Sequence, residues 1–172
     1  MPIVRMTFLR MADRRPVETM VERDDGVVFA MRGAGGGADL PHDLVHAVVE
    51  TALPIADGVW GCVADGVVWG SMRHVSGRRP PHAAERSDRL KQERRDAVMR
   101  AEHLADAVGR LARGEQVPAG AVADVPRERI DAAVAAVRDA ARRWAALPVG
   151  EEWVVEWTTS SRGQAQRRGL KR

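Results

Sequence analysis

The stretch DLPHDLVHAVVETAL, Asp39 to Leu53, carries the clearest helical signal in the chain. Its apolar residues recur at i, i+1, i+4, i+5, i+8 and i+9, which places them on one face of a helix: Leu44, Val45, Val48, Val49, Ala52 and Leu53. Pro41 suits a first helical turn, Asp39 is a candidate cap, and Pro54 ends the segment. The sequence therefore predicts a short helix whose apolar face packs into the core.

Three proton-active side chains follow one border of this apolar face: His42, His46 and Glu50. A border is where residues that line a cleft would lie, so these three are the candidate catalytic residues of an acid–base site. Asp43, at the start of the helix, and Trp60 are candidate substrate-lining residues. The alternative is that both histidines are half-exposed residues at the edge of the core, with Asp43 helping the helix to start.

The order His42-Asp43-Leu44-Val45-His46 also has the outline of the HExxH zinc motif, with Asp in place of Glu. A zinc ion, if bound, would use His42 and His46, or else His46 with Glu50. Glu50 lies about 12 Å along the helix from His42, so it cannot join both histidines on one ion. Because no third ligand is evident in the sequence, no metal cofactor is favoured.

The residues before this helix predict an antiparallel meander of three strands. Val4, Met6 and Phe8 alternate with polar residues, residues 17–23 repeat the pattern, and residues 27–32 follow the turn sequence Asp24-Asp25-Gly26. Residues 33–37, GAGGG, lack the spacing of a phosphate-binding loop and are expected to form a flexible connector.

The residues after the helix predict a short helix within 57–70, with a hairpin as the alternative, then an exposed loop over 74–81. Periodic apolar residues predict a long helix over 83–112 and another over 126–147, which bury their stripes against each other as an antiparallel hairpin. Residues 153–157 alternate as a last strand that rejoins the meander. The expected fold is α+β: an antiparallel sheet of about four strands packed against a short central helix and a long helical hairpin.

Length and charge define the expected domain. The chain has 172 residues, the size of one domain, and the single cysteine, Cys62, excludes an internal disulfide, as expected in the cytoplasm. No apolar run reaches the ~20 residues of a membrane span. The net charge is +3, and residues 159–172 carry +5 with no acid, which leaves −2 for residues 1–158. We expect one domain over 1–158 and a disordered basic tail over 159–172.

Three segments are similar to a family of small uncharacterised proteins of bacteria with GC-rich genomes. They are LPHDLVH with the VVE that follows it, DGVWG, and the closing WAALPVG at Trp144 to Gly150. The resemblance implies the same order of hairpin strands, helix, Gly-Trp segment and closing strand over nearly the whole chain. It implies no activity and no cofactor.

The sequence leaves three candidate functions open. The first is a small enzyme acting on an unknown small molecule through His42 and His46. The second is a non-catalytic binding or accessory protein that uses the helical hairpin to bind a protein or a second copy of the chain. The third is weak nucleic-acid binding by the tail, which the net acidic body does not favour. The absence of GxSxG, CxxC and Walker sequences leaves the reaction class open.

Overall fold

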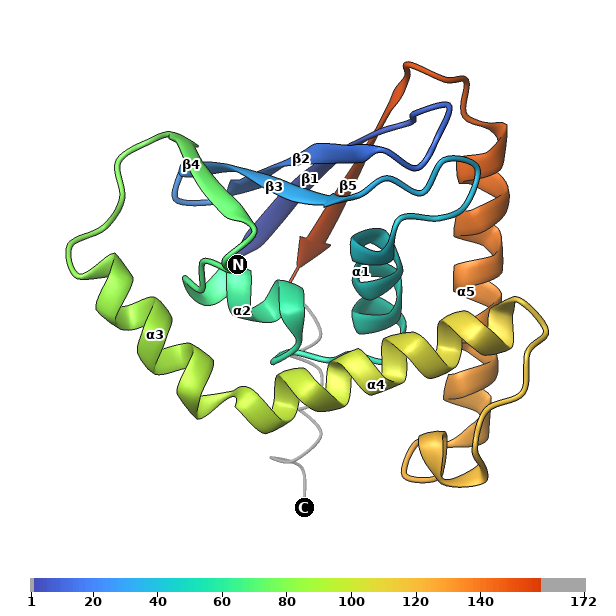
Figure 1. Ribbon diagram of the computed structural model, residues 1–172. Coiled ribbons are helices and arrows are strands. Elements are labelled where there is room, and N and C mark those ends of the chain that lie inside the picture. The colour runs from blue at the N-terminus through green and yellow to red at the C-terminus, as the bar shows by residue number, and fades with distance from the viewer. Residues whose placement is uncertain (1, 159–172) are drawn as a thin grey trace.

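The computed structural model describes residues 2–158, so the predicted disordered tail lies outside the described residues. Five strands form one antiparallel sheet in the order β4-β3-β2-β1-β5 (Figure 1). They are β1 (Ile3–Leu9), β2 (Pro16–Arg23), β3 (Val28–Ala34), β4 (Met72–Ser76) and β5 (Glu152–Thr158). The helices of the described part are α1 (His42–Ala52), α2 (Val59–Asp65), α3 (Ala83–Glu93), α4 (Arg95–Ala112), α5 (Arg127–Ala146) and the 3-10 turn η1 (Ala119–Val122). The α+β class is confirmed.

The sheet has one buried and one solvated face, as period-2 alternation requires. Val4, Met6 and Phe8 of β1 point into the core, and Met6 is paired with Val21 of β2 and Val155 of β5. The opposite face carries ion pairs across strands, including one in which Arg5 Nη2 lies 3.0 Å from Glu156 Oε1. All the helices lie on the buried side of the sheet (Figure 1).

Helix α1 lies between the sheet and the two long helices. Its Leu44 and Ala47 belong to the core that includes the sheet, α2 and Trp144, whereas Val49 and Leu53 belong to a second apolar cluster with α4 and α5. The stripes of α4 and α5 were expected to bury each other; both helices contact each other, but both also pack on α1. The central helix therefore joins the two halves of the core.

Two predicted boundaries are wrong. Met72–Ser76 pairs with β3 as a fifth, edge strand where an exposed loop was expected from residue 74 onward. Four of its five residues are exposed, so the sequence has no alternating apolar signal there. The helix expected over 83–112 breaks at Arg94, whose Nη1 lies 2.7 Å from Asp65 Oδ2. The break lets Leu90 of α3 pack on Cys62 and Val67 while α4 turns toward α1.

Residues 57–70 contain a helix and not a hairpin. Gly66 ends α2 in the left-handed conformation, with φ at 118°, which glycine adopts without strain. The GAGGG connector is packed instead of free: the Gly37 carbonyl accepts hydrogen bonds from Arg10 and from the Trp144 indole, the latter at 3.0 Å. A Cβ at Gly36 would lie 1.9 Å from the Asp39 carbonyl oxygen, so the loop needs glycine there.

Within residues 2–158, the longest apolar helical stretches fall short of what a bilayer crossing requires.

Candidate metal centre

Helix α1 presents His42 and His46 one turn apart, as the helical spacing predicts. Their Nε2 atoms lie 3.2 Å apart, and the ring centroids lie 4.7 Å apart with the planes at 80°. Pro41 occupies the N-cap position, and Asp39, the candidate cap, instead pairs with Arg14. The two imidazoles therefore converge through their distal nitrogens on one point outside the helix.

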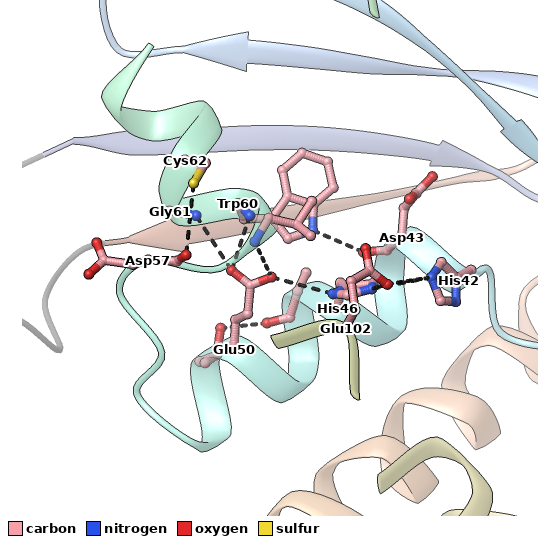
Figure 2. A network of polar contacts seen from close by, with 12 residues as sticks. His42, Asp43, His46, Glu50, Asp57, Trp60, Gly61, Cys62 and Glu102 are labelled. Carbon is pink, nitrogen blue, oxygen red and sulfur yellow. Dashed lines mark hydrogen bonds and ion pairs between the residues drawn. The ribbon is translucent and has the colours of Figure 1, made fainter. Parts of the chain in front are cut away.

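Glu102 of α4 brings a carboxylate to the same point (Figure 2). Its Oε2 lies 2.9 Å from His46 Nε2 and 3.6 Å from His42 Nε2. The sequence did not identify this residue, because it lies 56 positions from His46 on the polar side of a charged helix. The contact between α1 and α4 supplies the third group that the HDLVH segment lacked.

The three groups differ in exposure. The His46 side chain is 1% exposed, whereas those of His42 and Glu102 are 65% and 47% exposed. The alternative interpretation, that both histidines are half-exposed residues at the edge of the core, is wrong for His46, because its side chain lies inside. One side of the cluster is therefore fixed by packing and the other side is open to solvent.

Glu50 lies behind His46 and is also buried. Its Oε2 lies 3.5 Å from His46 Nδ1 and accepts a hydrogen bond from the Val59 N–H at 3.0 Å. Its Oε1 accepts from the Trp60 N–H at 3.0 Å and from the Gly61 N–H at 3.4 Å (Figure 2). The candidate catalytic carboxylate thus satisfies the free N–H groups at the start of α2 and lies behind His46, whose buried Nδ1 makes no hydrogen bond within residues 2–158.

The fit around Glu50 depends on Gly58. A Cβ at this position would lie 2.5 Å from the Glu50 carboxyl carbon. Gly58 is the N-cap of α2 and makes no side-chain capping bond, so the cap is supplied from another helix. Asp57, the first residue of the range in which a short helix was predicted, lies one residue before this N-cap.

Asp43 and Trp60, the candidate substrate-lining residues, occupy different positions. Trp60 is fully buried and its indole N–H donates to the Asp43 main-chain carbonyl at 3.0 Å, so it supports α1 from within the core. The Asp43 carboxylate points toward the sheet, away from the imidazoles (Figure 2). Asp43 and Glu102 both line a pocket of about 170 Å³, together with Met31, Val59, Trp69, Ser71 and Val98. The pocket therefore borders the cluster.

The titratable groups perturb one another. Burial lowers the pKa of His46, but Glu50 and Glu102 outweigh this effect and hold it above its ordinary value. Burial raises the pKa of Asp43, Glu102 raises it further, and His42 and His46 partly oppose the increase. Asp43 lines the pocket and His46 contacts its lining residue Glu102, and neighbouring groups with perturbed pKa values are typical of functional sites.

The His42, His46 and Glu102 atoms lie within 4.8 Å of one another, as the ligands of one metal ion would. Zinc bonded tetrahedrally at about 2.0–2.1 Å to nitrogen and oxygen separates its ligand atoms by roughly 3.3 Å. The observed separations of 3.2, 2.9 and 3.6 Å lie on both sides of that value. The arrangement has the dimensions of a three-ligand zinc site.

Comparison with protein-family models, with curated proteins and with solved structures gave no match to this chain. The resemblance of the LPHDLVH, DGVWG and WAALPVG segments to a family of small bacterial proteins therefore stays a hypothesis, and the functional case depends on the geometry of the site.

Proposed function

We propose that this protein binds one divalent transition metal, zinc foremost, through His42 Nε2, His46 Nε2 and Glu102 Oε2, and uses it to activate water for hydrolysis of a small substrate. The observation that carries the proposal is the triangle of ligand atoms, with sides of 3.2, 2.9 and 3.6 Å. Two histidines and a carboxylate, with a further position left for water, form a ligand set of catalytic zinc sites.

A metal suits these atoms better than protons alone. A proton on His46 Nε2 can be donated toward Glu102 at 2.9 Å or toward His42 at 3.2 Å, and one N–H cannot align well with both. A metal ion accepts a lone pair from all three atoms at once. Glu50, 3.5 Å from His46 Nδ1, stands where a carboxylate commonly orients a metal-bound imidazole.

The exposed side of the cluster leaves room for the reaction. A metal held by His42, His46 and Glu102 would supply Lewis-acid activation of a water molecule for hydrolysis. Asp43 lines the adjoining pocket with Glu102, and it is the residue assigned to pass a proton to a leaving group bound in that pocket. A pocket of about 170 Å³ admits only a small substrate or one end of a larger one.

Metal binding is tested by calorimetric titration of the untagged full-length protein with ZnCl2. We expect one site with a Kd in the micromolar range or below, and a loss of affinity of at least about tenfold in Glu102→Gln and His42→Gln. Glu93→Gln is the matched control, because Glu93 is an exposed glutamate on α3 that pairs with Arg89. Absence of zinc binding, or equal affinity in Glu102→Gln and wild type, would overturn the proposal.

The hydrolytic role is tested separately with p-nitrophenyl acetate as the probe. The zinc-loaded wild type should release nitrophenolate faster than the chelator-treated protein, and readdition of zinc should restore the rate. Glu102→Gln should lose the zinc-dependent part and Glu93→Gln should keep it. A rate that is independent of zinc in all variants contradicts hydrolysis at this site while leaving the binding result intact.

A further inference from the structure

A groove of about 700 Å³ lies where the start of α1 meets the C-terminal halves of α4 and α5. These three helices converge in Figure 1. Its floor is aliphatic and consists of Leu40, Val45, Gly109, Ala112, Val137 and Ala141. The volume lies within the ~300–1,000 Å³ typical of small-molecule pockets.

The rim of this groove is basic. Arg14, Arg113, Arg138 and Arg142 line it together with one acid, Asp39. Glu115 and Asp139 pair with Arg113 and Arg142, so four guanidinium groups and three carboxylates leave a local charge of +1. Residues 1–158 as a whole carry −2, so the rim is positive where the body is net negative. A positive rim above an apolar floor is complementary to a molecule with an anionic head and an apolar body.

Three of these arginines form ion pairs that a ligand can displace. Arg14 pairs with Asp39, Arg142 pairs with Asp139, and Arg113 Nε lies 2.7 Å from Glu115 Oε1. Their side chains are 60–75% exposed. Solvated pairs of this kind contribute at most about 1 kcal/mol, so exchanging the acidic partner for a ligand anion costs little.

Arg138 differs because its position is fixed. Its Nε donates to the Ala112 carbonyl at 3.1 Å and its Nη2 to the Leu111 carbonyl at 3.3 Å, which satisfies the end of α4. Within residues 2–158, no acidic group pairs with this guanidinium. Arg138 therefore holds an uncompensated positive charge at the groove wall.

We propose that the groove binds a small amphipathic anion, an aliphatic carboxylate whose head lies among Arg113, Arg138 and Arg142 and whose chain covers the floor beside Val45 and Ala141. Guanidinium groups match a carboxylate through paired N–H donors, and the aliphatic floor supplies the area that a chain buries. The groove is distinct from the His42–His46–Glu102 cluster, because Gly109 lies about 10 Å along α4 from Glu102.

The test is calorimetric titration of the full-length protein with octanoate, with octylamine and inorganic phosphate as comparison probes. We expect octanoate to bind, octylamine to bind at least about tenfold more weakly because the rim repels it, and inorganic phosphate to bind more weakly than octanoate because it leaves the floor empty. Octylamine binding as tightly as octanoate, or phosphate doing so, would overturn the proposal.

Variants locate the binding. The double variant Arg113→Gln/Arg142→Gln should bind octanoate at least about tenfold more weakly than wild type. The control double variant, Arg89→Gln/Arg127→Gln, changes exposed arginines outside the groove, and its affinity for octanoate should stay within about twofold of wild type. Ala141→Trp, which fills the floor, should also lower the affinity. Octanoate binding that is equal in wild type and the Arg113/Arg142 variant refutes the assignment, and that variant carries only exposed changes compatible with folding.

Discussion

Replacing Glu50 with Gln changes one atom of a fully buried side chain and tests whether this carboxylate holds the start of α2 in place. The carboxylate accepts three main-chain N–H groups, from Val59, Trp60 and Gly61. A glutamine amide has only one oxygen. In either orientation its NH2 faces at least one main-chain N–H donor, so donor meets donor in the core.

The expected loss follows from those hydrogen bonds. A hydrogen bond to a charged group contributes about 1.5–3 kcal/mol, and a buried N–H left without an acceptor costs about 1–3 kcal/mol. Loss of one such bond at either the 3.0 Å Val59 contact or the 3.0 Å Trp60 contact predicts a decrease of about 3 kcal/mol in the free energy of unfolding. For a chain of this length this corresponds to a fall of roughly 6–12 °C in Tm.

The assay is urea unfolding in the presence of EDTA, followed by tryptophan fluorescence. Glu102→Gln is the matched control, because it makes the same chemical change at a side chain that is 47% exposed and should cost no more than about 1 kcal/mol without metal. If Glu50→Gln unfolds with a free energy within about 0.5 kcal/mol of wild type, the carboxylate does not cap α2 in solution and this reasoning fails.

Three further outcomes are expected. Gly58→Ala places a Cβ 2.5 Å from the Glu50 carboxyl carbon and should cost about 2 kcal/mol or more in urea unfolding, whereas Gly120→Ala, with open space around it, should be nearly neutral. The raised pKa of His46 means that its protonated form stabilises the metal-free fold, fully so below about pH 6.5. The difference in unfolding free energy between wild type and His46→Gln should therefore fall as pH rises through the folded pKa of His46, whereas the rise in Tm caused by Zn²⁺ should grow with pH. The same pH trend in both measurements would contradict the assignment. Asp43→Asn should raise the stability at pH 7 by about 0.5–1 kcal/mol, with the gain shrinking toward pH 3, because a raised pKa means that the folded protein disfavours the ionised form; a loss at pH 7 in EDTA would show that the Asp43 charge is stabilising.

Local sequence was sufficient for most of the secondary structure. The first strands are predicted by the alternation of apolar and polar residues around Val4, Met6 and Phe8 and by the turn sequence Asp24-Asp25-Gly26. The turn forms as predicted, with Gly26 at a φ of 79°. The spacing of Leu44, Val48 and Val49 predicts α1. These features depend on neighbours within a few residues, which is the range over which periodicity and turn preferences act.

Elements without a local signal were missed. The edge strand β4 buries only Met72 among its five residues, so its pairing with β3 is decided by the sheet and not by its own pattern. The break at Arg94 has no proline or glycine to announce it; it places Leu90 on Cys62 and directs α4 toward α1. Both follow from packing between segments distant in sequence.

The candidate site divides in the same way. The sequence by itself determined that His42 and His46 share one face of a helix, because a four-residue spacing fixes this in any α-helix. Only the tertiary structure decided that Glu102 joins them, that Glu50 turns inward to cap α2, and that His46 is buried. A carboxylate 56 residues away reaches the histidines through the packing of α4 on α1, and helical periodicity carries no information about which helix faces which.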